Sequence, residues 1–279
     1  MTRYNVCVPY FSAAGDKTLM KVFVSLLRAV CVLLSVFGYA CGLWAQSPAP
    51  RFHVIALAEK GGIHKPFVDG AKVWLAQEAA RDHFTIDYIE NTEPINDAFL
   101  SRYQLFIQLN YPPYNWTPTA VAAFQRYIDE GRGGWIGFHH ATLLGHFDGF
   151  GLWPWFSDFM GGIQFKDYIA TFASGTVHVE DTHHPATQGL GSSFLIENEE
   201  WYTWDKDPRP NVHVLATVDE NSYTPATKIK MGGDHPVVWT NEHKKARNIY
   251  IFMGHHPELF QNKSFTTLFH NSILWAAHS

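Results

Sequence analysis

The chain of 279 residues is 46% hydrophobic and 17% charged, which supports a large packed core and excludes an intrinsically disordered protein. Its formal net charge is −5 and it has no long basic run, so it lacks the electrostatic signature of a protein that binds nucleic acid. Aromatic residues make up 15% of the chain, and such residues pack cores more often than they stack on sugars.

The N-terminal extension, residues 1–46, has the pattern of a secretory signal peptide. Two basic residues, Lys21 and Arg28, precede an apolar run over Ala29–Ala45 that ends in small residues. This order predicts export to the periplasm or the extracellular space, with cleavage near the end of the run. Residues 1–19 lack the pattern, so Met20 is a candidate for the true start.

The cysteines support the same interpretation. All three, Cys7, Cys31 and Cys41, lie in the leader region, so the mature chain would have no disulfide, no thiol nucleophile and no cysteine-bound metal. Two alternatives to cleavage stay open. The apolar run is close to spanning length and could remain as a membrane anchor, or Cys41 could carry a lipid. All sixteen histidines follow residue 50.

Short apolar runs and helical spacing alternate through the first half of the mature chain. The predicted strands are Phe52–Ala58, Phe84–Glu90, Tyr103–Asn110 and Trp135–Phe138, with helices at Pro66–Ala80, Pro94–Arg102 and Pro118–Glu130. Strands that alternate with helices predict parallel βαβ units with right-handed crossovers.

The second half of the chain alternates less regularly. It has a predicted short helix at Trp153–Met160, strands at Ala170–Glu180, Val212–Val218, Pro236–Thr240 and Asn248–Met253, and a final helix capped by Ser264. The segment Asp181–Arg209 is predicted to be rich in loops. No internal repeat or break divides the chain, so residues 47–279 are expected to form a single α/β domain.

Polar side chains follow several of the predicted strands. His64 comes after the first strand, His139 and His140 after the fourth, and His255 after the last. Because parallel strands of a doubly wound sheet end at one edge, we expect these histidines to converge with Glu200. Imidazoles with a carboxylate can act as general acid and base or bind a divalent metal. The metal alternative would use His64, His139 and His255, and no cofactor is otherwise indicated.

Two segments resemble known catalytic motifs. Gly137–Ala141 (GFHHA) has the layout of a nucleophile elbow, with His139 at the position of the nucleophile and His140 interpreted as structural. His256-Pro257-Glu258 resembles the segment that completes the triad of class I glutamine amidotransferases. Because the mature chain has no cysteine, thiol amidotransferase chemistry is excluded, and the resemblance concerns the fold.

From Phe52 to Ala277 the order of motifs resembles the ThuA-like (trehalose utilisation) family of the class I glutamine amidotransferase-like superfamily. The matching segments are GWIGFHHAT at 134–142, MGG at 160–162, HPAT at 184–187, EWY at 200–202, DENSY at 219–223, MGGDHP at 231–236 and GH at 254–255. The resemblance implies a flavodoxin-like, doubly wound, mostly parallel sheet in three α/β/α layers. Family members tend to carry a histidine where this chain has Phe165-Lys166-Asp167, so no site residue is assigned to that loop.

The resemblance also implies a function in carbohydrate metabolism. The family is linked to the breakdown of trehalose and related disaccharides, which implies a small-molecule carbohydrate substrate and a sugar dehydrogenase as a partner in the pathway. Our hypothesis assigns acid–base catalysis on a sugar or keto-sugar glycoside, by isomerisation, elimination or hydrolysis, to His139, His255 and Glu200. Substrate-binding roles are expected for His64, Tyr202, Trp201, Glu258 and His256. A non-catalytic sugar-binding protein and a metal-dependent glycoside hydrolase are the alternatives, and a homo-oligomer stays open.

Overall fold

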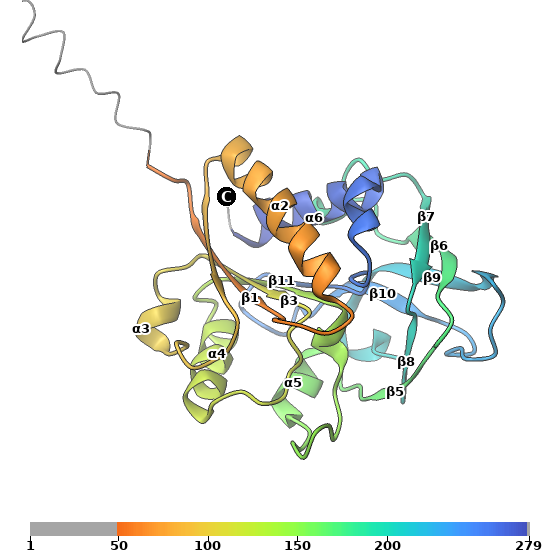
Figure 1. Cartoon of the computed structure of the whole chain (residues 1–279), viewed down its shortest axis with the longest axis horizontal. Coiled ribbons are helices and arrows are strands. Elements are labelled where there is room, and N and C mark those ends of the chain that lie inside the picture. The colour runs from red at the N-terminus through yellow and green to blue at the C-terminus, as the bar shows by residue number, and fades with distance from the viewer. Residues whose placement is uncertain (1–48, 278–279) are drawn as a thin grey trace, which may run out of the picture. The chain divides into compact units, whose positions relative to one another are not determined.

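A nine-stranded mixed sheet runs through residues 49–277, the part of the chain that the computed structural model describes (Figure 1). Its parallel half consists of β1 (His53–Ala58), β2 (Thr85–Ile89), β3 (Leu105–Leu109), β4 (Gly134–Phe138) and β11 (Asn248–Ile251). These strands lie in the order β2-β1-β3-β4-β11, which is the flavodoxin-like order. The predicted doubly wound α/β sheet is therefore confirmed.

The other half of the sheet is antiparallel. It continues from β11 through β10 (Pro236–Thr240), β9 (His213–Thr224), β6 (Ala173–Val179) and β7 (Ser193–Glu199). A small second sheet pairs β5 (Phe165–Tyr168) with β8 (Tyr202–Trp204). The prediction of a loop-rich Asp181–Arg209 was wrong, because this segment holds β7 and β8. At the edge of the sheet, β7 is largely exposed, so it lacks the apolar run that marks a buried strand.

Helices cover both faces of the sheet and complete the three layers. Figure 1 shows α2 (Lys65–Asp82) and α6 (Lys263–Ala276) on one face, and α3 (Asp97–Leu100), α4 (Pro118–Asp129) and α5 (Pro154–Phe159) on the other. The cap predicted for the last helix was wrong. Asn262, not Ser264, is the N-cap of α6, and its side-chain oxygen accepts the backbone N–H groups of Ser264 and Phe265 at 3.0 and 3.2 Å.

The predicted signal peptide lies outside the described residues. Within residues 49–277, no helix is both long and apolar enough to cross a membrane. Export therefore stays a prediction of the sequence.

Glu220 holds the loop between β9 and β10 in place. Its carboxylate accepts the backbone N–H groups of Met231 and Gly232, and it contacts Nδ1 of the buried His235 at 3.0 Å. Burial alone would raise the pKa of Glu220, but these hydrogen bonds outweigh it and lower the pKa below its ordinary value of 4.5. The ionised carboxylate therefore stabilises this loop.

We expect Glu220→Gln to lower the free energy of unfolding by about 1–3 kcal/mol at pH 7, because buried N–H donors lose a charged acceptor. A lowered folded-state pKa gives stability that is present above pH 4.5 and is lost as the pH falls through the folded value. The variant should therefore lose less stability than the wild type between about pH 5 and pH 3. Urea unfolding at several pH values measures both effects. The exposed Glu197→Gln is the matched control, and identical pH slopes for wild type and Glu220→Gln would contradict the prediction.

Candidate active site

A cavity of about 380 Å³ lies beside the carboxyl ends of the parallel strands, a size within the range of small-molecule sites. One part of its wall is polar and consists of Glu59, His64, His140 and Glu200. The other part is mainly apolar and aromatic, with Phe147, Phe165, Tyr168 and Tyr202 among its residues. This position next to the β1/β3 reversal of strand order is where doubly wound sheets place their ligands.

His64 lies at the N-cap of α2, directly after the loop that leaves β1. The side chain is buried, with Nδ1 3.7 Å from Glu59 Oε2 and Nε2 3.9 Å from Glu200 Oε2. Burial lowers the pKa of His64 below its ordinary value, so the ring is mainly neutral near pH 7.

His139 directly follows β4 and has a left-handed backbone conformation, φ = 35°. Strain of this kind at a strand end is typical of a nucleophile elbow, as the GFHHA pattern predicts. The side chain is fully buried, and burial lowers its pKa well below the usual value. Its Nδ1 lies 3.3 Å from the carbonyl oxygen of Phe252 and its Nε2 3.4 Å from Glu200 Oε2. The imidazole thus lies between two hydrogen-bond acceptors, and it is buried behind the residues that line the cavity.

The turn after β11 packs directly against this elbow. A Cβ atom at Gly254 would lie 2.8 Å from His139 Cβ and 2.9 Å from Asn110 Oδ1, so only glycine fits there without a shift. Asn110 in turn donates its side-chain N–H to the carbonyl oxygen of Gly254 at 2.6 Å. The close approach brings His255 next to the residues that follow β3 and β4.

His140 lines the cavity, although the sequence indicated a structural role for it. Its Nδ1 lies 3.2 Å from the carbonyl oxygen of Asn110 and 3.3 Å from Glu59 Oε2. Both neighbours are acceptors, so Nδ1 carries the proton and Nε2 keeps a free lone pair. This is the tautomer that a general base requires, with a carboxylate behind it.

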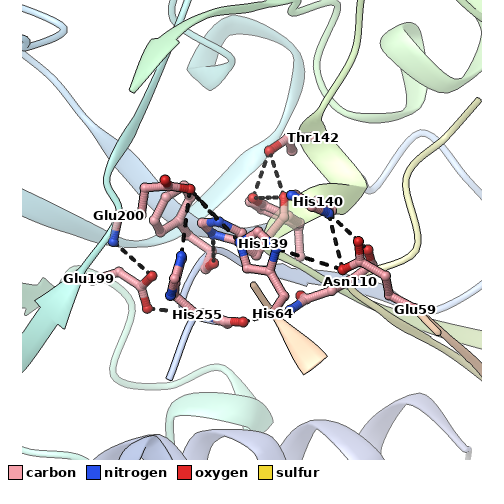
Figure 2. Close-up of polar contacts among 12 residues, drawn as sticks. Glu59, His64, Asn110, His139, His140, Thr142, Glu199, Glu200 and His255 are labelled. Atoms are coloured by element: carbon pink, nitrogen blue, oxygen red, sulfur yellow. Dashed lines mark hydrogen bonds and ion pairs between the residues drawn. The ribbon is translucent and has the colours of Figure 1, made fainter. Parts of the chain in front are cut away.

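Three histidines approach a single carboxylate oxygen, Glu200 Oε2 (Figure 2). The distances are 3.4 Å from His139 Nε2 and 3.9 Å from both His64 Nε2 and His255 Nε2. Burial would raise the pKa of Glu200, but the neighbouring imidazoles of His139 and His64 dominate and hold the pKa well below its usual range. Glu200 is therefore ionised in the centre of the cluster.

His255 is buried, and neither of its ring nitrogens has a hydrogen-bond partner within residues 49–277. Its ring packs against His64 and Phe172 at centroid distances of 4.4 and 4.5 Å. Burial lowers the pKa of His255 to about 4. A neutral imidazole with two unpaired nitrogens is uncommon in a protein interior, because each unpaired polar group costs free energy.

Glu199 joins the segments that carry Glu200 and His255. Its carboxyl group accepts the backbone N–H groups of Glu200 at 3.0 Å and Gly254 at 3.2 Å. Burial raises the pKa of Glu199 to about 8, so it is mainly protonated at pH 7 and leaves Glu200 as the charged group of the pair.

Not every predicted site residue lies at the cavity. Tyr202, His64 and Glu200 do, whereas Trp201 packs in the core, stacked on Phe252 at 5.3 Å. Glu258 is exposed and His256 half-buried, and neither is in the cavity wall. The sequence reasoning missed Glu59, Asn110 and the position of His140 in the cavity wall. Glu59 directly follows β1 and Asn110 directly follows β3. The expectation that side chains at the ends of parallel strands converge therefore applies to both residues as well.

The family model for ThuA, described as trehalose utilisation, matches residues 53–276. A solved structure described as a ThuA-like protein from Bacteroides uniformis is 30% identical, with a TM-score of 0.73, and covers 84% of this chain and 94% of that one. A ThuA-like protein from Parabacteroides merdae is 16% identical, with a TM-score of 0.58, and covers 81% of this chain and 89% of that one.

A structure described as a GMP synthase component from Thermoplasma acidophilum shares the fold, at 12% identity and a TM-score of 0.50. It covers 81% of this chain and 94% of that one. No curated protein sequence matches the chain. The chain therefore belongs to the ThuA family, which is associated with carbohydrate utilisation, and it has the fold of the class I glutamine amidotransferases.

Proposed function

We propose that this protein is an enzyme that removes a proton next to the carbonyl group of a keto-sugar glycoside. The observation that carries the proposal is His140, whose Nδ1 is fixed by Asn110 and Glu59 while its side chain lines the cavity. A base must present a lone pair to the substrate, and an imidazole that carries its proton on Nδ1 keeps a lone pair on Nε2.

The chemistry follows from the acidity of protons next to a ketone. In a 3-keto glycoside, Nε2 of His140 takes the proton from C2, and the C–H electrons form a double bond between C1 and C2 as the glycosidic C1–O bond breaks. The imidazolium on His140 then supplies a proton to the departing oxygen. The products are an unsaturated keto sugar and a free alcohol, so atoms and charge balance.

The buried cluster lies directly beside the base, since the ring centroids of His64 and His140 are 4.0 Å apart. His64 and Glu200 reach the wall, while His139 and His255 lie behind them. We therefore place the substrate carbonyl beside His64, and assign Glu200 to orienting His64 and His139 to positioning Glu200 through the 3.4 Å contact. A keto sugar must be made by oxidation of the parent sugar, so a sugar dehydrogenase is the partner that this proposal requires.

A substrate panel tests the proposal. Purified protein is incubated with trehalose and other disaccharides and with their 3-keto derivatives, and the products are separated by mass. We expect the keto derivatives to be consumed and the parent sugars to remain. Binding of the keto derivatives without turnover would overturn the proposal in favour of a sugar-binding protein. Release of two intact sugars from an unoxidised disaccharide would indicate a glycoside hydrolase instead.

Tyr168 offers an aromatic face to the substrate, because it lines the cavity and is 43% exposed. We expect Tyr168→Ala to raise KM by about 2- to 10-fold, the loss of one stacking contact, with kcat nearly unchanged. Steady-state kinetics on the keto disaccharide measure this. Phe150→Ala is the control, since Phe150 is also exposed (41%) but is not in the cavity wall. Equal KM values for wild type and Tyr168→Ala would contradict the prediction.

A further inference from the structure

We infer that His64, Glu200 and His255 bind a divalent first-row transition-metal ion. The inference rests on the proposed function and names the cofactor of that site. Each residue offers one ligand atom, and these atoms all lie within 4.8 Å of one another. The set differs in one member from the three histidines that the sequence predicted, because Glu200 replaces His139.

The spacing of the three ligand atoms is close to that of a bound metal. Nε2 of His64 and Nε2 of His255 are each 3.9 Å from Glu200 Oε2. Metal–ligand bonds of 2.0–2.2 Å in a tetrahedral site place neighbouring ligand atoms about 3.3–3.6 Å apart. A contraction of a few tenths of an ångström would bring each histidine to that spacing from Glu200, and the two histidine ligand atoms lie within 4.8 Å of each other.

Unpaired nitrogens provide a second, independent observation. Nε2 of His64 and both ring nitrogens of His255 are buried and have no hydrogen-bond partner within the described part of the chain. The Nε2 atoms of both rings lie toward Glu200 (Figure 2). A metal ion at their centre would satisfy one nitrogen of each ring and would offset the cost of burying them.

The surrounding residues resemble the outer shell of a metal site. Nδ1 of His64 lies 3.7 Å from Glu59 Oε2, and carboxylates in this position usually orient metal-bound histidines. His139 contacts Glu200 at 3.4 Å and the carbonyl oxygen of Phe252 at 3.3 Å. Both partners are acceptors, so a neutral His139 can donate its single N–H to only one of them.

The site has three protein ligands and would leave one coordination position free. Two histidines and one glutamate are a ligand set of catalytic zinc enzymes, which keep a further position for water or substrate. His64 and Glu200 both line the cavity, so that position faces the substrate. There a metal ion would polarise the carbonyl oxygen of the keto sugar as His140 removes the neighbouring proton.

A second cluster of possible ligands serves as a comparison. Glu78, Asp82 and His270 also come within ligand distance of one another, on α2 and α6. Arg81 already contacts Glu78 and His270 there, so a cation occupies this cluster. It should not bind a metal.

The test measures binding of Co²⁺ and Zn²⁺ alone to the full chain after treatment with a chelator. Visible absorption follows Co²⁺, and elemental analysis counts Zn²⁺ after dialysis. We expect one equivalent in the wild type and in His270→Ala. In His255→Ala and in the isosteric Glu200→Gln we expect affinity to fall by at least about tenfold. Urea unfolding establishes that each variant is folded.

Several results would overturn the inference. These are less than half an equivalent of either metal in the folded wild type, unchanged affinity in folded His255→Ala or Glu200→Gln, or loss of binding in His270→Ala. Activity separates this inference from the proposed function. Full turnover of the keto sugar by metal-free protein would contradict a catalytic metal and support the base mechanism. Stoichiometric metal at this site with no turnover of any keto sugar would support the site and contradict the proposed function.

Discussion

Replacing His140 by alanine should lower kcat on a 3-keto disaccharide by about 10²- to 10⁴-fold, with a much smaller change in KM. The expected loss is large because the base acts only in the transition state, whereas other groups hold the substrate in the ground state. The Nδ1 contacts to Asn110 and Glu59 fix the tautomer, so Glu59→Gln should lower kcat by a smaller factor. Steady-state and single-turnover kinetics measure both variants.

The control for His140→Ala is His183→Ala, since the His183 side chain is almost fully exposed and does not line the cavity. Its kinetics should equal those of the wild type. A kcat within twofold of the wild type for His140→Ala would exclude this residue as the base. A rise in KM alone would assign it to substrate binding.

Phe252→Ala is expected to lower the free energy of unfolding by about 3–5 kcal/mol, the range for removal of a fully buried aromatic side chain. The Phe252 ring stacks on Trp201 at 5.3 Å and packs edge-on against Tyr202 and His139 at 5.5 and 5.1 Å. Its removal leaves a cavity directly beneath the strained elbow, so activity should fall as well.

Urea unfolding measures this change, and Leu195→Ala is the control because Leu195 is 50% exposed on the edge strand. The control should change stability by less than about 0.5 kcal/mol. A loss of less than about 1 kcal/mol for Phe252→Ala would contradict the prediction. It would mean that Trp201 and Tyr202 move into the space left by the ring, or that Phe252 does not support the turn at His139.

The parallel half of the fold could be predicted because its strands are short, buried runs separated by helical segments, as in Trp135–Phe138. In the antiparallel part of the fold, β6, β9 and β10 were also predicted as strands, but β7 and β8 were not. Exposed β7 and the three residues of β8 carry no periodic signal, and their places in the two sheets come from long-range pairing. The cap of α6 was misplaced by two residues because Asn262 and Ser264 are both good capping residues.

The structure brings the strand-end histidines together with Glu200, as the sequence predicts, but the places of neighbouring residues could not be assigned from spacing. In an extended strand, adjacent side chains point to opposite faces. Both histidines lie beyond the end of β4, in a 3-10 turn over His139–Thr142 that begins with a positive φ, so strand alternation does not place them. His139 is buried there while His140 lines the cavity. No sequence pattern specifies this local rotation, and the structure was needed to show it.

Glu200 follows β7 at the outer edge of the antiparallel half, whereas His64, His139 and His140 belong to the parallel half. An edge strand opens at a lower free-energy cost than the centre of a sheet. Transient opening of β7 would therefore remove the central carboxylate while the parallel core stays folded. Any ligand held by Glu200 stabilises the closed edge by mass action, so occupancy of the cavity and protection of this edge from hydrogen exchange are thermodynamically linked.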